Sequence, residues 1–352
     1  MTIDGCEPPG RGPRRLARAA GSVAVAALMI LGLPACGDTI LDLFRAEPPP
    51  GALTKDAPPV IETTPVPLNM AAPDETQVGR LRYRGGLSLS SEDRRFGGLS
   101  GLTVSPDGTR FIAVADVGYW VHGSLVYDDA HDLAGVAEVQ IEPMRGLDGR
   151  YLSGHRHRDA ESVTRMPDGS LIVAFERDHR LWAYAEPGAT PTALTQPDGL
   201  SAAPLNEGVE ALATLPDGRL LAITEGLFHE PDTVVGWVQD GAGGWDKLFY
   251  QVGGGFRPTG ATVLPDGDVL ILERRFPPVG ARVRRFPATD AVAGATISAR
   301  EIARLEGALT VDNMEGLSAR QTADGTVLIY MLSDDNFRPI QRTLLMMFEL
   351  LD

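Results

Sequence analysis

The chain has 352 residues, a formal net charge of −15 and only two cysteines. This acidic balance leaves no basic footprint, which argues against nucleic acid or an anionic lipid surface as a partner. The length is sufficient for one large hydrophobic core.

The first 35 residues predict a lipoprotein signal peptide. Four arginines precede an apolar run over residues 19–33, which is shorter than the roughly 20 residues of a membrane span. The run ends in Leu33-Pro34-Ala35-Cys36, which resembles the bacterial lipobox, in which the Cys becomes the lipidated first residue of the mature protein. The alternative is a plain signal peptide that happens to contain a Cys. We therefore expect export to the periplasmic side of the bacterial envelope and a membrane anchor on Cys36, with the outer membrane favoured over the inner.

Residues 36–78 predict a tether between this anchor and a folded domain over residues 79–352. The segment is rich in proline and has no sustained apolar periodicity. Because Cys6 would leave with the signal peptide and Cys36 would carry the lipid, we expect no disulfide in the domain.

A tight turn recurs along the predicted domain. Asp-Gly stands between two short apolar runs at five places, and the aspartates are Asp107, Asp168, Asp217, Asp266 and Asp324. Asp-Gly between such runs indicates a β-hairpin, because Gly accepts the positive φ that tight turns require. The intervals are 61, 49, 49 and 58 residues. Strand hairpins at intervals of about 50 residues are typical of β-propeller blades.

Each hairpin is followed by weaker strand candidates, which agrees with the four strands of a propeller blade. Two further strand-like segments, Arg80–Leu89 and Thr343–Leu351, lie at the ends of the domain. We expect strands from both termini to close the ring, either by sharing a sixth blade or by completing the first, because an open ring would expose strand edges. The predicted fold is an all-β propeller of six four-stranded blades, favoured over five or seven.

Carboxylates occupy matching positions of the predicted hairpins. The start of the first strand and the end of the second lie opposite the turn, so these positions converge at one rim of a propeller. The carboxylates are Glu161, Glu210 and Glu315 at the starts, with Asp159 beside them, and Asp116, Glu176, Glu225, Glu273 and Asp334 at the ends. Clustered like charges require compensation, and hard divalent cations prefer several carboxylate oxygens. We therefore predict that these residues form a site for divalent metal cations. The alternative is pairing with nearby arginines that only holds the blades together.

The segments Gly98-Leu99-Ser100-Gly101-Leu102, Asp159-x-Glu161-Ser162, Thr224-Glu225-Gly226 and Asn313-Met314-Glu315-Gly316-Leu317 carry a resemblance to a known family. From about Gly79 to the C-terminus the chain resembles the phytase-like domain proteins, described by "esterase-like activity of phytase". The chain departs from the family pattern where the Gly after Glu is replaced by Ser162 and Ala211. The first and fourth units also lack the Glu, which favours a cluster on one side of the channel over a complete ring.

The resemblance implies a six-bladed propeller and Ca²⁺-assisted hydrolysis of phosphate esters. It implies that Glu161, Glu210 and Glu315 hold the cations at the reaction centre. Arg177 and Arg274 would stabilise the charge that develops on the phosphate. The expected partner is a small phosphorylated or ester substrate, and we expect a monomer.

Two other functions stay open at this point. One is a propeller hydrolase with a single metal, such as a lactonase, for which Asn206 and Asn313 are candidate ligands. The other is a non-catalytic lipoprotein that binds a partner at the cell surface. The sequence has no Gly-x-Ser-x-Gly elbow and no His-Glu-x-x-His motif, which sets aside the corresponding serine and zinc hydrolases.

Overall fold

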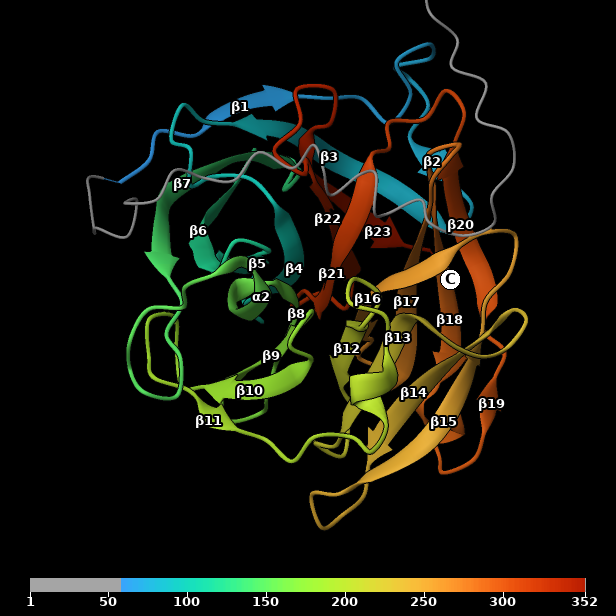
Figure 1. The fold of residues 1–352 in the computed structure, drawn as a ribbon. Coiled ribbons are helices and arrows are strands. Elements are labelled where there is room, and N and C mark those ends of the chain that lie inside the picture. Colours follow the sequence, from blue (N-terminus) through green and yellow to red (C-terminus); the bar gives the residue numbers. More distant parts are fainter. Residues whose placement is uncertain (1–57, 352) are drawn as a thin grey trace, which may run out of the picture.

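The computed structural model describes residues 58–351 and forms five sheets arranged around a central axis (Figure 1). The predicted signal peptide, Cys36 and the first part of the predicted tether lie outside the described residues. Within residues 58–351 no helix has the length and apolar character needed to span a membrane. The prediction of an all-β propeller is confirmed, but the number of blades is five and not six.

The first two blades are four-stranded antiparallel sheets. The first blade contains β4 (Leu99–Val104), β5 (Arg110–Ala115), β6 (Tyr119–Tyr127) and β7 (Leu133–Pro143). A short helix, α2 (His155–Arg158), leads to the second blade. The second blade contains β8 (Ala160–Arg165), β9 (Leu171–Phe175), β10 (Arg180–Tyr184) and β11 (Thr192–Ala193).

The third and fourth blades follow the same plan, and the third carries an added edge strand. After the 3-10 helix η1 (Leu200–Ala202), the third blade contains β12 (Val209–Thr214), β13 (Leu220–Glu230), β14 (Thr233–Gln239) and β15 (Trp245–Gln251). The fourth blade contains β16 (Arg257–Val263), β17 (Asp268–Arg275), β18 (Gly280–Pro287) and β20 (Arg300–Glu306). Between β18 and β20, η2 (Ala288–Asp290) leads to β19 (Thr296–Ile297), which pairs in parallel with β15.

Both ends of the described chain build the fifth blade. Its sheet contains β21 (Asn313–Gln321), β22 (Val327–Asp334), β23 (Thr343–Leu350), β3 (Leu81–Ser90) and β1 (Glu62–Pro65), with β2 (Gln77–Val78) also paired to β3. The expected closure by strands from both termini is therefore confirmed, because β23 pairs with β3. These two strands complete the blade of the Asp324 hairpin, and so no sixth blade forms.

The ordered sheet begins upstream of Gly79, the boundary that the sequence predicted. β1 pairs with β3, and Leu68 is fully buried. The backbone N–H of Thr310 donates to the carbonyl oxygen of Leu68 at 2.7 Å. Part of the predicted tether is thus an integral part of the fifth blade.

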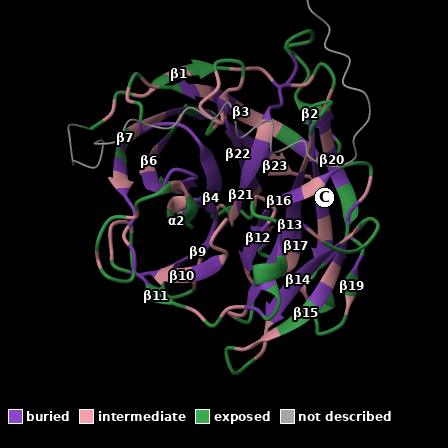
Figure 2. Ribbon diagram, viewed as in Figure 1, coloured by how far each residue is buried: buried purple, intermediate pink, exposed green. Residues whose placement is uncertain are grey.

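The hydrophobic core lies between neighbouring blades, where buried residues follow the inner strands (Figure 2). Phe111 of the first blade packs in one cluster with Tyr330 and Met347 of the fifth. Leu221 of the third blade shares another cluster with Ile271 of the fourth. Each blade is therefore apolar on both faces, and this explains why the inner strands read as nearly continuous apolar runs.

The innermost strand of every blade has the same irregularity near its start. The pairing register shifts by one residue in β4, β8, β12, β16 and β21, as in a β-bulge. The extra residues are Ser100, Glu161, Glu210, Thr259 and Glu315, and each is at most 7% exposed. A bulge bends its strand and changes the direction of the side chain at that point. The five bulges place three carboxylates and two hydroxyls at equivalent positions around the axis.

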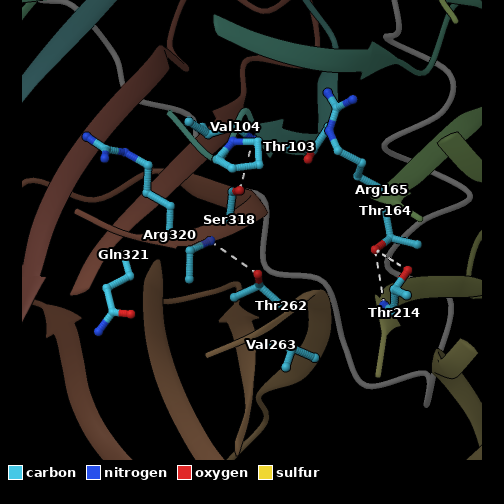
Figure 3. Close-up of a pocket in the computed structure, with 12 residues that line it drawn as sticks. Thr103, Val104, Thr164, Arg165, Thr214, Thr262, Val263, Ser318, Arg320 and Gln321 are labelled. Atoms are coloured by element: carbon cyan, nitrogen blue, oxygen red, sulfur yellow. Dashed lines mark hydrogen bonds between the residues drawn. The ribbon is translucent and has the colours of Figure 1, made fainter. Parts of the chain in front are cut away.

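The opposite ends of the inner strands surround a cavity of about 390 Å³ (Figure 3). Three hydroxyls there accept backbone N–H groups of the next blade. Ser318 Oγ accepts from Val104 at 2.9 Å, and Thr262 Oγ1 accepts from Ala319 at 3.1 Å. The third pair is Thr164 Oγ1 and the N–H of Thr214, at 3.1 Å. We call Thr164, Thr262 and Ser318 the hydroxyl latches, because each joins two neighbouring blades.

Candidate functional site

In each blade, the part of the second strand that pairs with the first strand ends at or near the bulge. The residues that pair with the position just before each bulge are Ala115, Phe175, Thr224, Glu273 and Ser333. The next residue in each blade is Asp116, Glu176, Glu225, Arg274 or Asp334. We call these five residues, together with the five bulge residues, the rim ring. Four of its five strand-end positions are thus acidic, and the fourth blade supplies an arginine.

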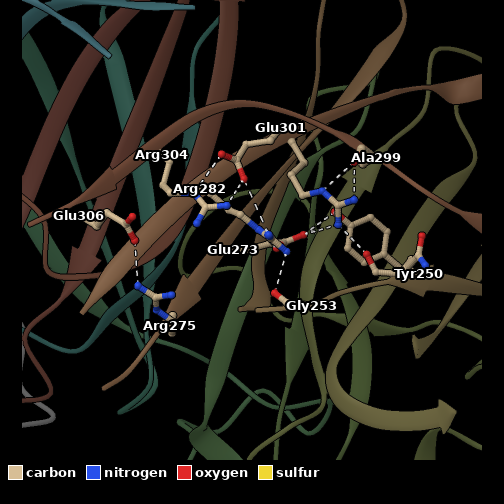
Figure 4. A network of polar contacts seen from close by, with 11 residues as sticks. Tyr250, Gly253, Glu273, Arg275, Arg282, Ala299, Glu301, Arg304 and Glu306 are labelled. Carbon is tan, nitrogen blue, oxygen red and sulfur yellow. Dashed lines mark hydrogen bonds and ion pairs between the residues drawn. The ribbon is translucent and has the colours of Figure 1, made fainter. Parts of the chain in front are cut away.

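Glu273 was predicted to lie at the rim with the other carboxylates. It lies one residue before the ring position of its blade, which Arg274 occupies, and it does not join the rim ring. It is fully buried and accepts hydrogen bonds from Arg282 and from Arg284, the latter at 3.1 Å (Figure 4). The hydroxyl of Tyr250, on β15 of the third blade, donates to it at 2.6 Å. Glu273 therefore pairs internally with arginines and helps to join the third and fourth blades.

Asp159, Glu161 and Glu176 come together in the second blade. One carboxylate oxygen from each lies within 4.8 Å of the other two, and the residues are 1%, 7% and 3% exposed. The bulge at Glu161 brings its side chain to the end of β9, which Glu176 follows. Arg177 Nε lies 2.5 Å from Asp159 Oδ2, and the N–H of Gly208 donates to Glu176. Three buried carboxylates at this spacing fit a hard divalent cation.

The electrostatics of the ring show an excess of negative charge beside this cluster. Burial, together with Glu161, Asp159 and Glu225, raises the pKa of Glu176 well above its ordinary value. Burial, followed by the charges of Glu225, Glu315 and Glu176, also raises the pKa of Glu210. Among residues 58–351, Glu210 Oε2 is a buried atom with no hydrogen-bond partner. Protons or a cation are therefore needed to compensate these carboxylates.

Arg274 lies between two other carboxylates of the ring. Its Nη2 lies 2.9 Å from Glu225 Oε1, and its Nε lies 3.3 Å from Glu315 Oε1. Asn313 Nδ2 also donates to Glu315 Oε1, at 2.7 Å. Burial raises the pKa of Glu315 to about 7, although the charge of Arg274 opposes this shift. This side of the ring already contains its own positive charge.

Asp116 and Asp334 are the remaining predicted carboxylates, and both belong to the rim ring. Asp116 is fully buried after β5, and Asp334 is 3% exposed and accepts the N–H of Asn336 at 2.6 Å. Arg275 forms an ion pair outside the ring, with its Nη2 2.8 Å from Glu306 Oε2 (Figure 4). In α2, which precedes the second blade, His157 Nδ1 lies 3.1 Å from Asp178.

The place of Arg274 at the strand-end position of the fourth blade was not predicted. The spacing from the Asp-Gly turns does indicate this position. Glu176 follows Asp168 by eight residues, and Glu225 follows Asp217 by eight. Arg274 follows Asp266 by the same interval. None of the five bulges was predicted, and the equivalent positions of Ser100 and Thr259 were missed because neither residue carries a charge that interrupts an apolar strand.

The profile of the Phytase-like family, described as "Esterase-like activity of phytase", matches residues 94–337. The chain belongs to the Phytase-like family. The matched segment contains every residue of the rim ring and most of the five blades of this Phytase-like protein. A search of curated proteins gives no match.

Several solved structures resemble this Phytase-like protein at low identity. A protein assigned as a gluconolactonase has 15% identity and a TM-score of 0.43, with 82% of this chain and 94% of that chain covered. An inactive variant of a virginiamycin B lyase from Staphylococcus aureus, with quinupristin, has 10% identity and a TM-score of 0.38, with 80% and 88% covered. A glucose dehydrogenase has 12% identity and a TM-score of 0.40, with 76% and 98% covered.

Proposed function

We propose that this Phytase-like protein is a hydrolase of small phosphoric esters that uses a divalent cation at the rim ring. The observation that carries the proposal is the buried cluster of Asp159, Glu161 and Glu176, whose carboxylate oxygens lie within 4.8 Å of one another. Membership of the Phytase-like family supports the class of reaction.

The donor set fits a hard cation, and Ca²⁺ is the ion we favour. Asp159, Glu161 and Glu176 would hold it, because each offers a buried carboxylate oxygen. A cation bound there would supply positive charge that neutralises the phosphate and polarises the bond to the leaving group. Burial is the largest cause of the raised pKa of Glu176, and the negative charges of Glu161, Asp159 and Glu225, which this cation would compensate, raise it further.

Glu210 is suited to hold and deliver a proton. Its raised pKa means that the carboxyl retains a proton well above pH 4.5. Since Oε2 has no hydrogen-bond partner among the described residues, a proton on that atom is available to the oxygen of the departing alcohol. Glu315, with a pKa of about 7, is in turn able to exchange a proton near neutral pH.

Two arginines would orient the substrate. The side chain of Arg274 is 26% exposed, so part of its guanidinium is accessible beside Glu225 and Glu315. Arg177 follows Glu176, and its side chain is 11% exposed while it pairs with Asp159. Guanidinium groups bind phosphate oxygens well, so these two would hold the substrate and stabilise the charge that develops on it.

The first test measures hydrolysis of p-nitrophenyl phosphate by the full-length protein in detergent, in EDTA and in millimolar Ca²⁺. We expect activity that requires the cation and falls at least about 100-fold in the Glu161→Gln variant. Glu306→Gln is the matched control, because Glu306 pairs with Arg275 outside the ring. Equal activity in EDTA and in Ca²⁺ would refute the role of the cation. Hydrolysis of lactones but not of phosphate esters would favour the single-metal lactonase instead.

From the sequence we also propose a lipid anchor on Cys36 at the periplasmic side of the envelope. Labelling of cells with radioactive palmitate should mark the native protein and not the Cys36→Ala variant. Equal labelling of both proteins, or of neither, would contradict this anchor. Cys36 lies outside the described residues, so this proposal depends on the Leu33-Pro34-Ala35-Cys36 motif.

A further inference from the structure

We propose that Arg274 is a built-in cation of the rim ring and confines the exogenous divalent cation to one site, on the side of the second and third blades. This inference rests on the proposed function, because it concerns how many cations the ring holds and where.

The first step is the register of the fourth blade. At the strand end, where the other four blades have Asp or Glu, this blade has Arg274. At its bulge stands Thr259, whose hydroxyl donates to the carbonyl of Met314 at 2.8 Å. The fourth blade therefore contributes one positive charge and no negative charge to the ring.

The second step is how far this charge reaches. Arg274 lies 2.9 Å from Glu225 and 3.3 Å from Glu315, which belong to the third and fifth blades. A guanidinium carries a permanent charge and offers several N–H donors in one plane. It therefore occupies the space between these two carboxylates in which a divalent cation would otherwise bind. Asn313 adds a neutral donor to Glu315 at 2.7 Å.

The other side of the ring has unsatisfied oxygen atoms. The cluster of Asp159, Glu161 and Glu176 is buried in the second blade. Next to this blade on either side, two bulge residues have buried oxygens without a hydrogen-bond partner in the described part of the chain. These atoms are Glu210 Oε2, in the third blade, and Ser100 Oγ, in the first. Buried polar atoms without partners are rare in native proteins, and an unobserved ion or water is a common explanation.

These observations predict a cation-binding stoichiometry of one. The cluster of Asp159, Glu161 and Glu176 binds the cation. Glu225 and Glu315 bind Arg274 instead.

The test is calorimetric titration of the full-length protein in detergent with CaCl₂, after removal of metals by EDTA. We expect one bound Ca²⁺ per chain. The Glu176→Gln variant should weaken binding at least about tenfold, whereas the Glu315→Gln variant should retain one site with an affinity within about threefold of the native protein. Binding is the readout, so the result does not depend on activity.

A second pair of variants tests Arg274 itself. We expect Arg274→Glu to bind two Ca²⁺ ions, because it leaves three carboxylates together in place of an internal ion pair. Arg274→Gln, which perturbs folding less, should add a weaker second site. Far-UV circular dichroism and a thermal melt confirm that each variant is folded.

Several outcomes would overturn the inference. Two or more sites in the native protein would refute it while leaving cation-assisted hydrolysis intact. Loss of binding in Glu315→Gln with retention in Glu176→Gln would refute it too, and would also contradict the assignment of the cation to Asp159, Glu161 and Glu176. Absence of Ca²⁺ binding by the native protein, together with activity in EDTA, would refute both proposals.

Discussion

The burial of Glu315 has a measurable consequence at the scale of one residue. Its pKa is about 7 in the folded protein and about 4.5 in an unfolded chain, chiefly because burial disfavours the charged form. Between these two values the unfolded chain releases the proton while the folded chain retains it. Stability of the cation-free protein should therefore fall as the pH rises from about 4.5 to about 7, by the order of 3 kcal/mol from this residue, and change little from this cause outside that window.

Urea denaturation in EDTA at pH 5 and at pH 8 measures this effect. The Glu315→Gln variant should lose about 3 kcal/mol of the difference, because Gln resembles the protonated carboxyl and does not titrate. Glu176 and Glu210, whose pKa values burial also raises, should keep the rest of the pH dependence. A pH dependence as large in the variant as in the native protein would contradict this assignment. Glu306→Gln, which changes a carboxylate with 40% side-chain exposure outside the ring, is the control.

At the same scale, the predicted site shows what the sequence can and cannot provide. The alternation of strands is visible in the sequence, and so the expected gathering of Glu161, Glu176 and Glu210 around the axis agrees with the structure. The position of Glu273 depends on a difference of one residue, and one residue reverses the side of a strand to which a side chain points. Arg282 and Arg284, which donate hydrogen bonds to Glu273, lie on the next strand. Nothing in the sequence indicates that they pair with it.

At the scale of the elements, the hydroxyl latches hold each inner strand against the next blade. In the Ser318→Ala variant, the N–H of Val104 would lose its acceptor in a buried position. Leaving a buried donor without a partner costs about 1–3 kcal/mol, so we expect a loss of unfolding free energy in that range. Thr103→Ala is the matched control. Thr103 lines the same cavity, and its hydroxyl makes no hydrogen bond within the described part of the chain. Urea unfolding should show a lower midpoint for Ser318→Ala with an unchanged slope; equal midpoints for the two variants would argue against a role for the latch.

At the scale of the whole molecule, residues that the sequence assigned to a tether build the outer edge of the fifth blade. A chain that begins at residue 58 keeps β1 and the burial of Leu68, whereas a chain that begins at Gly79 loses both. Burial of one Leu side chain contributes about 1.5–3 kcal/mol, and the loss of β1 exposes an edge of β3. We therefore expect the chain from Gly79 to be less stable by at least about 3 kcal/mol, measured by urea denaturation, and more prone to aggregate. Equal stability would show that residues 58–78 are dispensable.

The number of blades shows the limit of reading a closed fold from local patterns. The five Asp-Gly hairpins correspond to the five blades, and the strands at the two ends were correctly expected to close the ring. Thr343–Leu350 and Leu81–Ser90 are outer strands of the blade that contains the Asp324 turn. The sequence could not show this, because their pairing joins residues at opposite ends of the chain. Long-range pairing is a property of the assembled ring and has no local signature.

The five bulges also give the scaffold a particular freedom to vary. A bulged residue lies outside the regular pairing of its strand, so exchanging it alters the centre of the molecule without changing the pattern that packs the blades. Ser100, Glu161, Glu210, Thr259 and Glu315 already show this freedom, since two neutral and three acidic side chains occupy equivalent places on one backbone. Proteins built on this plan can therefore diverge in what they bind through single substitutions, one blade at a time, while the architecture that supports them is inherited intact.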